Sequence, residues 1–138
     1  MKVYTIGYGG RNPADLVALL NQKGIRAVVD VRLRPDRASM GCYVRAKSPD
    51  RGIQALLNKA GIEYFSFPEL GNVFLDRDNW CDLYSALLSR AGDLLTARLK
   101  QTPQPFCLMC AEKRVAECHR RLIAGYLVEN GYQVEHLE

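Results

Sequence analysis

The segment between residues 107 and 120 holds the side chains with the widest range of chemistry in this chain. Three of the five cysteines lie there, close to an acidic residue, a histidine and an arginine: Cys107, Cys110, Glu112, Cys118, His119 and Arg120. A cysteine thiolate is a nucleophile, and carboxyl and imidazole groups move protons. We therefore regard Cys110 and Cys118 as candidate nucleophiles, and Glu112 and His119 as candidate acids or bases.

The same segment also contains four potential zinc ligands. Cys107 and Cys110 are three residues apart on a predicted strand, so their side chains should point to opposite faces. Cys118 and His119 are neighbours on a predicted helix and should diverge by about 100°. Because zinc needs converging ligands, we predict no metal site, and nothing in the sequence calls for another cofactor.

Two further acidic residues, Asp30 and Glu69, lie at the ends of predicted strands. Asp30 and Arg32 are two positions apart on one strand and should point to the same side. Asp30 is either a base or orienting group beside an anion-binding Arg32, or half of a structural ion pair. Glu69, which follows Pro68, is either a general acid or base or an exposed loop residue.

A glycine-rich turn precedes the first predicted helix and is a candidate phosphate-binding turn. It runs Gly7-Tyr8-Gly9-Gly10-Arg11, but Asn12 stands where a dinucleotide fingerprint has its third glycine. The alternative is a tight strand-to-helix turn that requires small residues. The candidate anion-binding residues are Gly7, Tyr8, Gly9, Arg11, Arg32, Lys113 and Arg120.

Strand and helix patterns alternate along the whole chain. Strands are predicted at 3–6, 27–31, 64–67, 106–110 and 132–137; helices are predicted to start near Asn12, Ser48, Asp78 and Cys118 and to end near Gly24, Gly61, Lys100 and Gly131. Strands joined by helices predict a single α/β domain over residues 1–138, with three layers and a mostly parallel five-stranded sheet. Rossmann-like and flavodoxin-like strand orders fit equally well.

Ligands of such sheets bind at the carboxyl ends of the strands. The candidate residues follow the first four predicted strands, so we expect them to meet at that edge. His119 lies at the start of the last predicted helix, and we expect its side chain to face this edge of the sheet. A helix N-terminus favours neutral imidazole and a thiolate over a thiol.

Several of these motifs, taken together and in this order, resemble a known family. They are Tyr4-Thr5-Ile6-Gly7, Asp30-Val31-Arg32 with Pro35, Glu69-Leu70-Gly71, Cys110-Ala111-Glu112 and Cys118-His119-Arg120. The sequence is similar to the DUF488 family of uncharacterised bacterial and archaeal proteins. Tyr8 stands where many members have a histidine. The resemblance implies the fold and the position of the site, and it assigns no reaction.

The charge of the chain is concentrated in one segment. The net charge is +4, from 19 basic and 15 acidic residues. Six of the basic residues but only two of the acidic ones lie between 32 and 51, so this segment accounts for the whole excess. Arg34, Arg37, Arg45 and Lys47 could follow a nucleic-acid backbone, and Tyr43 could stack on a base.

No apolar run is long enough to cross a membrane, and no secretory segment precedes the first predicted strand. With an odd number of cysteines, this pattern predicts a cytoplasmic protein without a membrane partner. Its cysteines are then expected to be thiols or ligands rather than a disulfide framework.

Three functions remain open from the sequence. The first is a small enzyme that binds a phosphate-bearing ligand, a nucleotide or nucleic-acid component, and uses Asp30, Glu69, Glu112 or His119 for proton transfer. The second is a thiol-dependent transferase using Cys110 or Cys118. The Asp30-Val31-Arg32 motif is similar to rhodanese domains, but Ala116 stands where a Cys-x5-Arg loop has its arginine. The third is a non-enzymatic module that binds a ligand or nucleic acid through residues 32–51.

Overall fold

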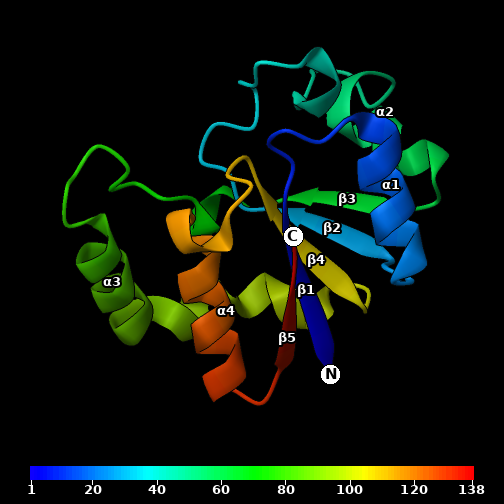
Figure 1. Ribbon diagram of the computed structural model, residues 1–138. Helices are drawn as coiled ribbons and strands as arrows, with labels where there is room; N and C mark the ends of the chain where they lie inside the picture. The colour runs from blue at the N-terminus through cyan, green and yellow to red at the C-terminus, as the bar shows by residue number, and fades with distance from the viewer.

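The computed structural model describes all residues, 1–138, and strands alternate with helices along the chain (Figure 1). The elements are β1 (Lys2–Gly7), α1 (Pro13–Gln22), β2 (Ala27–Asp30), α2 (Gly52–Lys59), β3 (Glu63–Ser66), α3 (Trp80–Leu95), β4 (Phe106–Cys110), α4 (Arg120–Glu129) and β5 (Gln133–Leu137). None of the helices combines the length and the apolar character that crossing a bilayer requires.

The five strands form one parallel sheet, which confirms the predicted α/β class. The strand order is β3-β2-β4-β1-β5, so both predicted orders are wrong. Each of them places β1 beside β2, whereas here β4 lies between these two strands. Cys107 of β4 is in register with Tyr4 on one side and with Val28 on the other. The apolar pattern of a strand indicates how deeply it is buried, but it does not predict which strands it pairs with.

Helices cover both faces of the sheet and create two separate cores. On one face α1 and α2 contribute Leu16, Leu20, Ile53 and Leu57, which pack with Cys107 and Met109 of β4. On the other face α3 and α4 contribute Tyr84, Leu88, Ile123 and Leu127, which pack with Phe106, Leu108 and Cys110. Figure 1 shows the two helix pairs on opposite sides of the sheet. Every residue of β4 is buried, as expected of a central strand between two layers.

The first helix begins and ends as its sequence predicts. The Oδ1 atom of Asn12 accepts a hydrogen bond from the backbone N–H of Asp15 at 2.8 Å, and Pro13 occupies the first helical position. Gly24 follows the helix with a φ of 67°, a conformation that favours glycine.

Two predicted helix boundaries are wrong. α2 begins at Gly52 rather than near Ser48, because the Ser48 hydroxyl accepts from the Asp50 N–H and closes a separate turn. α3 begins at Trp80 and stops at Leu95. The Thr96 hydroxyl then donates to the Gly92 carbonyl at 2.7 Å, and a short 3-10 turn over Ala97–Gln101 replaces the predicted continuation.

The ends of β1 and β4 are joined beyond the regular sheet. The backbone N–H of Tyr8 donates to the Cys110 carbonyl at 3.0 Å, and that of Gly9 donates to the Ala111 carbonyl at 2.9 Å. A Cβ atom at Gly7 would overlap the carbonyl oxygen of Glu112. The glycine-rich turn therefore fixes the segment that follows Cys110, and it needs a glycine to approach so closely.

Replacing Gly7 with alanine should destabilise the fold by about 1–3 kcal/mol or more, because the new methyl group meets backbone atoms that cannot rotate away. The free energy of unfolding in urea measures this loss. Gly125→Ala in α4 is the matched control, since a Cβ there meets open space. That variant should gain up to about 1 kcal/mol from helix propensity. Equal stability of the two variants would contradict the packing described for Gly7.

Candidate functional site

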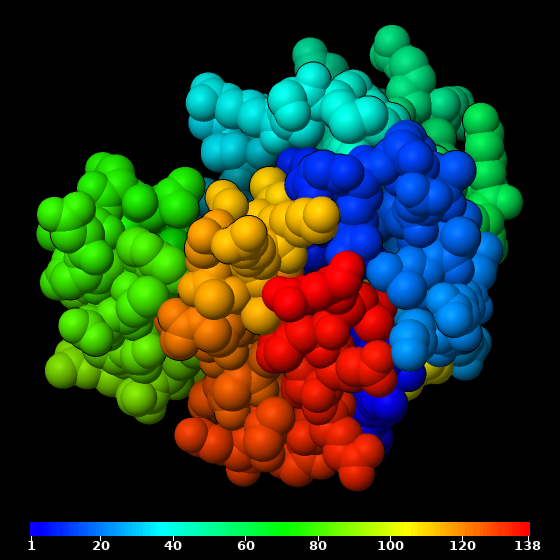
Figure 2. All heavy atoms as spheres, in the orientation of Figure 1, coloured from blue at the N-terminus to red at the C-terminus, as the bar shows by residue number.

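A pocket of about 240 Å³ opens at the carboxyl edge of the sheet. Residues following β1, β2, β3 and β4 line it: Tyr8, Arg32, Leu33, Arg34, Arg37, Asn72, Leu75, Cys110, Ala111, Glu112, Glu117, Cys118 and His119. The segment after β4, yellow to orange in Figure 2, forms part of the visible surface beside the residues 33–47 above it. The pocket thus lies where parallel α/β sheets bind their ligands.

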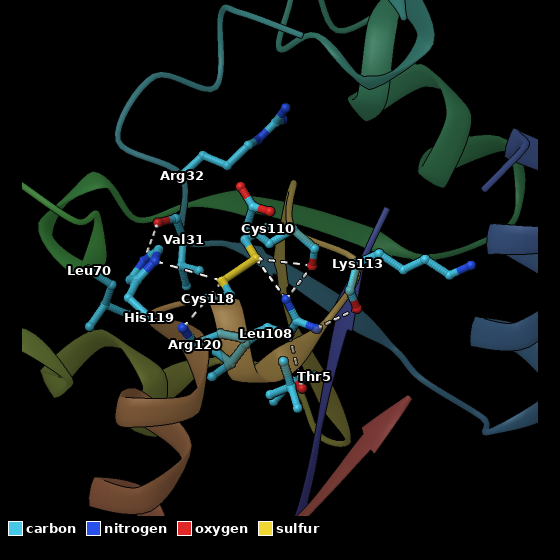
Figure 3. Close-up of a disulfide and its surroundings, with 12 residues drawn as sticks. Thr5, Val31, Arg32, Leu70, Leu108, Cys110, Lys113, Cys118, His119 and Arg120 are labelled. Atoms are coloured by element: carbon cyan, nitrogen blue, oxygen red, sulfur yellow. Dashed lines mark hydrogen bonds between the residues drawn. A yellow bond between two sulfur atoms is a disulfide. The ribbon is translucent and has the colours of Figure 1, made fainter. Parts of the chain in front are cut away.

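Cys110 and Cys118 form a disulfide beside this pocket (Figure 3). The expectation that the cysteines are thiols or ligands is therefore wrong for this pair, while Cys42, Cys81 and Cys107 are free. Cys110 ends β4 and Cys118 immediately precedes the His119 cap of α4, and residues 111–117 turn back so that the two sulfurs meet. Their eight-residue separation gave no sign of this pairing, because the reversal depends on how the loop packs.

Arg120 is the most unusual residue of the site, because its side chain is fully buried without an acidic partner. Its Nη1 atom donates to the Cys110 sulfur at 2.9 Å and to the Glu112 carbonyl at 2.5 Å. Nη2 donates to the Lys113 carbonyl at 3.1 Å, and Nε donates to the Thr5 hydroxyl at 3.3 Å. Burial lowers the pKa of the guanidinium. All its hydrogen-bond partners are neutral, so no carboxylate contacts the guanidinium, and the nearest acidic side chains, Glu112 and Glu138, act on it only at longer range.

Cys118 and His119 lie at the entrance to α4. The backbone N–H of Arg120 donates to the Cys118 sulfur at 3.4 Å. The Nε2 atom of His119 lies 3.0 Å from the Val31 carbonyl, which assigns the ring hydrogen to Nε2. The unprotonated Nδ1 atom is then 3.8 Å from the Cys118 sulfur. Burial lowers the pKa of His119, which keeps its imidazole neutral at pH 7.

Asp30 and Arg32 form a closed buried network. The Arg32 guanidinium donates to both carboxylate oxygens, with the shortest contact 2.6 Å from Nη2 to Oδ2. The Tyr64 hydroxyl donates to the same Oδ2 atom at 2.5 Å, and Arg32 reaches the Tyr8 hydroxyl with Nη1 at 3.0 Å. Burial raises the pKa of Tyr64. Although burial opposes its charge, hydrogen bonding to Asp30 raises the pKa of Arg32. Asp30 does not line the pocket, whereas Arg32 does.

Six other predicted site residues do not line the pocket: Gly7, Gly9, Arg11, Glu69, Lys113 and Arg120. Glu69 accepts two hydrogen bonds of 2.7 Å from Arg98, and this contact lowers the pKa of the Glu69 carboxyl. Arg11 donates to the carbonyls of Gly7 and Glu138 at 2.9 and 2.8 Å. Figure 3 shows the side chain of Lys113 directed away from the disulfide. The Gly9 N–H is occupied by the Ala111 carbonyl.

Sequence reasoning missed several lining residues. Arg34 and Arg37 had been considered only for nucleic acid, yet both reach the pocket; Arg45 and Lys47 do not. Asn72 and Leu75 come from the loop after β3. The motif Glu69-Leu70-Gly71 pointed to this loop, but Glu69 itself turns outward. No spacing pattern could have identified Arg120 as the partner of Cys110.

The fold and the site together define a parallel α/β domain with a cysteine pair and a buried arginine at the carboxyl end of its central strand. Over residues 12–127 the chain matches the model of the domain of unknown function DUF488. The match covers most of the chain, so the protein belongs to the DUF488 family, as its motifs had indicated. Comparisons with curated proteins and with solved structures found no match.

Asp30→Asn should cost about 3–5 kcal/mol of stability, because it leaves the buried Arg32 charge without its counter-ion. The free energy of unfolding at pH 7 measures this. Glu69→Gln is the control, since it breaks an exposed ion pair and should cost less than about 1 kcal/mol. A loss in Asp30→Asn as small as that of the control would show that the buried network is not needed for stability.

Acidification from pH 7.5 to 5.5 should destabilise the protein through His119. The imidazole protonates more readily in the unfolded chain, near its ordinary pKa of about 6.5, than in the folded one. The unfolded state then binds more protons, and stability falls by at most about 1.4 kcal/mol per pH unit. Unfolding curves for His119→Asn should have a shallower pH slope. His136→Asn is the comparison: partial desolvation also lowers the pKa of that histidine, but its side chain is more exposed than that of His119, so its loss should change the slope less. An unchanged slope in His119→Asn would contradict the assignment.

Proposed function

We propose that the protein is a thiol-dependent enzyme that binds an anionic, phosphate-type ligand at the carboxyl edge of the sheet. Cys110 is the nucleophile in its reduced form, and Arg120 holds it as a thiolate. The thiolate attacks the group to be transferred: a bond forms between that group and sulfur, and the bond to the leaving group breaks with its electron pair. A nucleophilic acceptor, water or an alcohol, then attacks the group. The bond to sulfur breaks with its electron pair, and Cys110 returns to the thiolate.

The buried guanidinium of Arg120 is the observation that carries this proposal. A cation removed from water needs a compensating charge nearby, and in the disulfide form every hydrogen-bond partner of Arg120, the Cys110 sulfur included, is neutral. When the disulfide is reduced, a thiolate at Cys110 supplies that charge, since the sulfur already lies 2.9 Å from Nη1 in the disulfide form. Adjacent arginine side chains are known to favour the thiolate form of cysteine. In a Cys-x5-Arg loop the arginine would stand at position 116, which is alanine here; Arg120 is instead the arginine that contacts the cysteine sulfur.

The anionic ligand is inferred from the arginines around the pocket. Arg32 is paired with Asp30, and Arg34 is paired with Asp36 at 3.0 Å. Arg37 lines the pocket and its side chain makes no hydrogen bond or ion pair in the structure. It is therefore the cation most available to a phosphate group.

The acid–base enzyme considered from the sequence has less support. Asp30 is ion-paired with Arg32 and accepts a hydrogen bond from Tyr64, and Glu69 is paired with Arg98 outside the pocket. Glu112 and His119 do line the pocket and remain candidates for moving the proton of the leaving group. Nucleic-acid binding by residues 32–51 stays an alternative function, and the cytoplasmic location stays a prediction.

Alkylation of the reduced protein tests the proposal. With iodoacetamide at pH 6.5, Cys110 should react at least several-fold faster than Cys42 or Cys81. The guanidinium at Cys110 is fully buried and 2.9 Å from the sulfur, whereas the one at Cys81, from Arg121, is partly exposed and 3.4 Å away. Peptide mass spectrometry reads the label at each cysteine. Arg120→Lys should keep much of this excess and Arg120→Gln should abolish it. Circular dichroism of both variants checks that they fold. Equal labelling of Cys110 and Cys42 would overturn the proposal.

Inorganic phosphate is the probe for the ligand. At millimolar concentration it should slow alkylation of Cys110 but not of Cys42. Arg37→Gln should weaken this protection several-fold. Arg51→Gln is the matched control, because it removes the same charge from the same basic segment outside the pocket. If Arg51→Gln weakens protection equally, the effect is general electrostatic attraction and the proposed pocket is wrong.

A further inference from the structure

We propose that Cys118 is a resolving cysteine: it closes a disulfide on Cys110 after a hydroperoxide has oxidised that thiolate, and a dithiol opens the bond again. The inference rests on the proposed role of Cys110 as a thiolate. It adds a second catalytic residue and a class of oxidant to the site. It also assigns the disulfide of the structure to the oxidised state of a reversible couple.

Only one of the other four cysteines is placed for this role. Cys107 lies three residues before Cys110 on the same strand, but it packs in the core on the opposite face of the sheet. Burial raises the pKa of its thiol, which keeps it protonated. Cys42 and Cys81 are free and half-buried, and neither lines the pocket. Cys118 alone shares the pocket with Cys110 and is bonded to it.

Both sulfurs receive hydrogen bonds from one residue, which assigns their different roles. The side chain of Arg120 donates to Cys110 and its backbone N–H donates to Cys118. Cys110 faces a full charge, so it is the thiolate that meets the oxidant. Cys118 faces a peptide N–H at the entrance of α4, a weaker stabilisation that keeps more of its thiol form.

His119 is placed to accept the proton of the Cys118 thiol. Its Nε2 hydrogen is directed to the Val31 carbonyl, and this leaves the Nδ1 lone pair 3.8 Å from the Cys118 sulfur. A neutral imidazole beside a thiol is the usual way to activate a cysteine nucleophile. Figure 3 shows His119 and Arg120 on either side of the cysteine pair. The second attack therefore has its own base, separate from the cation that serves Cys110.

The segment between the two cysteines gives the oxidant a route to sulfur. Residues 111–117 are exposed except for the half-buried Val115, although the disulfide sulfurs are buried. In Figure 2 the same segment lies on the outer surface of the molecule. Hydrogen bonds from Gly9 and Arg120 hold the carbonyls of residues 111–113. Residues 114–117 lie beyond those contacts and are mostly exposed, so this part of the segment can adjust when the disulfide opens.

The chemistry balances without a metal or an organic cofactor. The Cys110 thiolate attacks the outer oxygen of a hydroperoxide, the O–O bond breaks, and an alcohol or water leaves after taking a proton. Cys110 becomes a sulfenic acid. The Cys118 sulfur then attacks the Cys110 sulfur; the S–S bond forms and water leaves, carrying the hydroxyl of the sulfenic acid and the thiol proton. A dithiol reduces the disulfide by exchange and becomes a disulfide itself.

Oxidation of the reduced full chain with one equivalent of hydrogen peroxide tests the inference. The unmodified protein should lose 2 Da with Cys110 and Cys118 joined, and dithiothreitol should reverse this. Cys118→Ser should instead accumulate a sulfenic acid on Cys110 that dimedone traps, with at least several-fold more adduct than the unmodified protein. Cys81→Ser is the control and should behave like the unmodified protein.

The outcomes separate the inference from the proposed function. If Cys118→Ser keeps fast alkylation of Cys110 but the unmodified protein traps as much dimedone as this variant, Cys118 does not resolve and only the inference fails. A peroxide-induced disulfide to Cys42 or Cys81 would likewise overturn it. If Cys110 in Cys118→Ser is neither alkylated quickly nor oxidised, while circular dichroism reports a folded chain, the proposed thiolate itself fails.

Discussion

The rest of the site depends on a single buried cation. Arg120 contacts a strand through Thr5, the segment after β4 through two carbonyls, and Cys110 through its sulfur. Removing a guanidinium from water costs several kcal/mol unless another charge balances it. The second buried arginine, Arg32, has its carboxylate at 2.6 Å. Arg120 has no carboxylate among its hydrogen-bond partners, so in the function proposed above a thiolate at Cys110 would be the charge in contact with it.

Strand order explains why the sulfur is there. β4 is the central strand, and the neighbours β2 and β1 lead into helices on the face opposite to α4. At the carboxyl end of β4 the chain therefore crosses to one face of the sheet, while the chain after β1 and β2 crosses to the other face. Parallel sheets open a crevice where neighbouring connections diverge in this way. Cys110 is the last residue of that strand. The glycine-rich turn after β1 closes one side of the crevice by donating its amides to the chain beyond Cys110. The glycines of this turn are needed for close approach to the backbone of residues 111–113.

Local chemistry could be predicted from the sequence, and long-range choices could not. The Asn12 cap, the parallel sheet and the gathering of polar residues at one edge follow from short patterns and one topological rule. The strand order depends on which apolar strands pair, and every interior strand looks alike in sequence. The pairing of Cys110 with Cys118 depends on a loop reversal. The contact between Arg120 and Cys110 depends on both the strand order and this reversal. The predicted facing of Cys107 away from Cys110 is confirmed, because strand alternation is local.

That alternation places two thiols of opposite character three residues apart on one strand. Cys107 has no exposed surface and packs between the sheet and the helices α1 and α2, while Cys110 borders the pocket. Global unfolding must precede any reagent reaching Cys107, whereas a local opening of the loop suffices for Cys110. The two thiols therefore report on two different opening events of the same molecule. In a labelling experiment on the reduced protein, the ratio of alkylation at Cys110 to that at Cys107 distinguishes local opening of the site from unfolding of the domain.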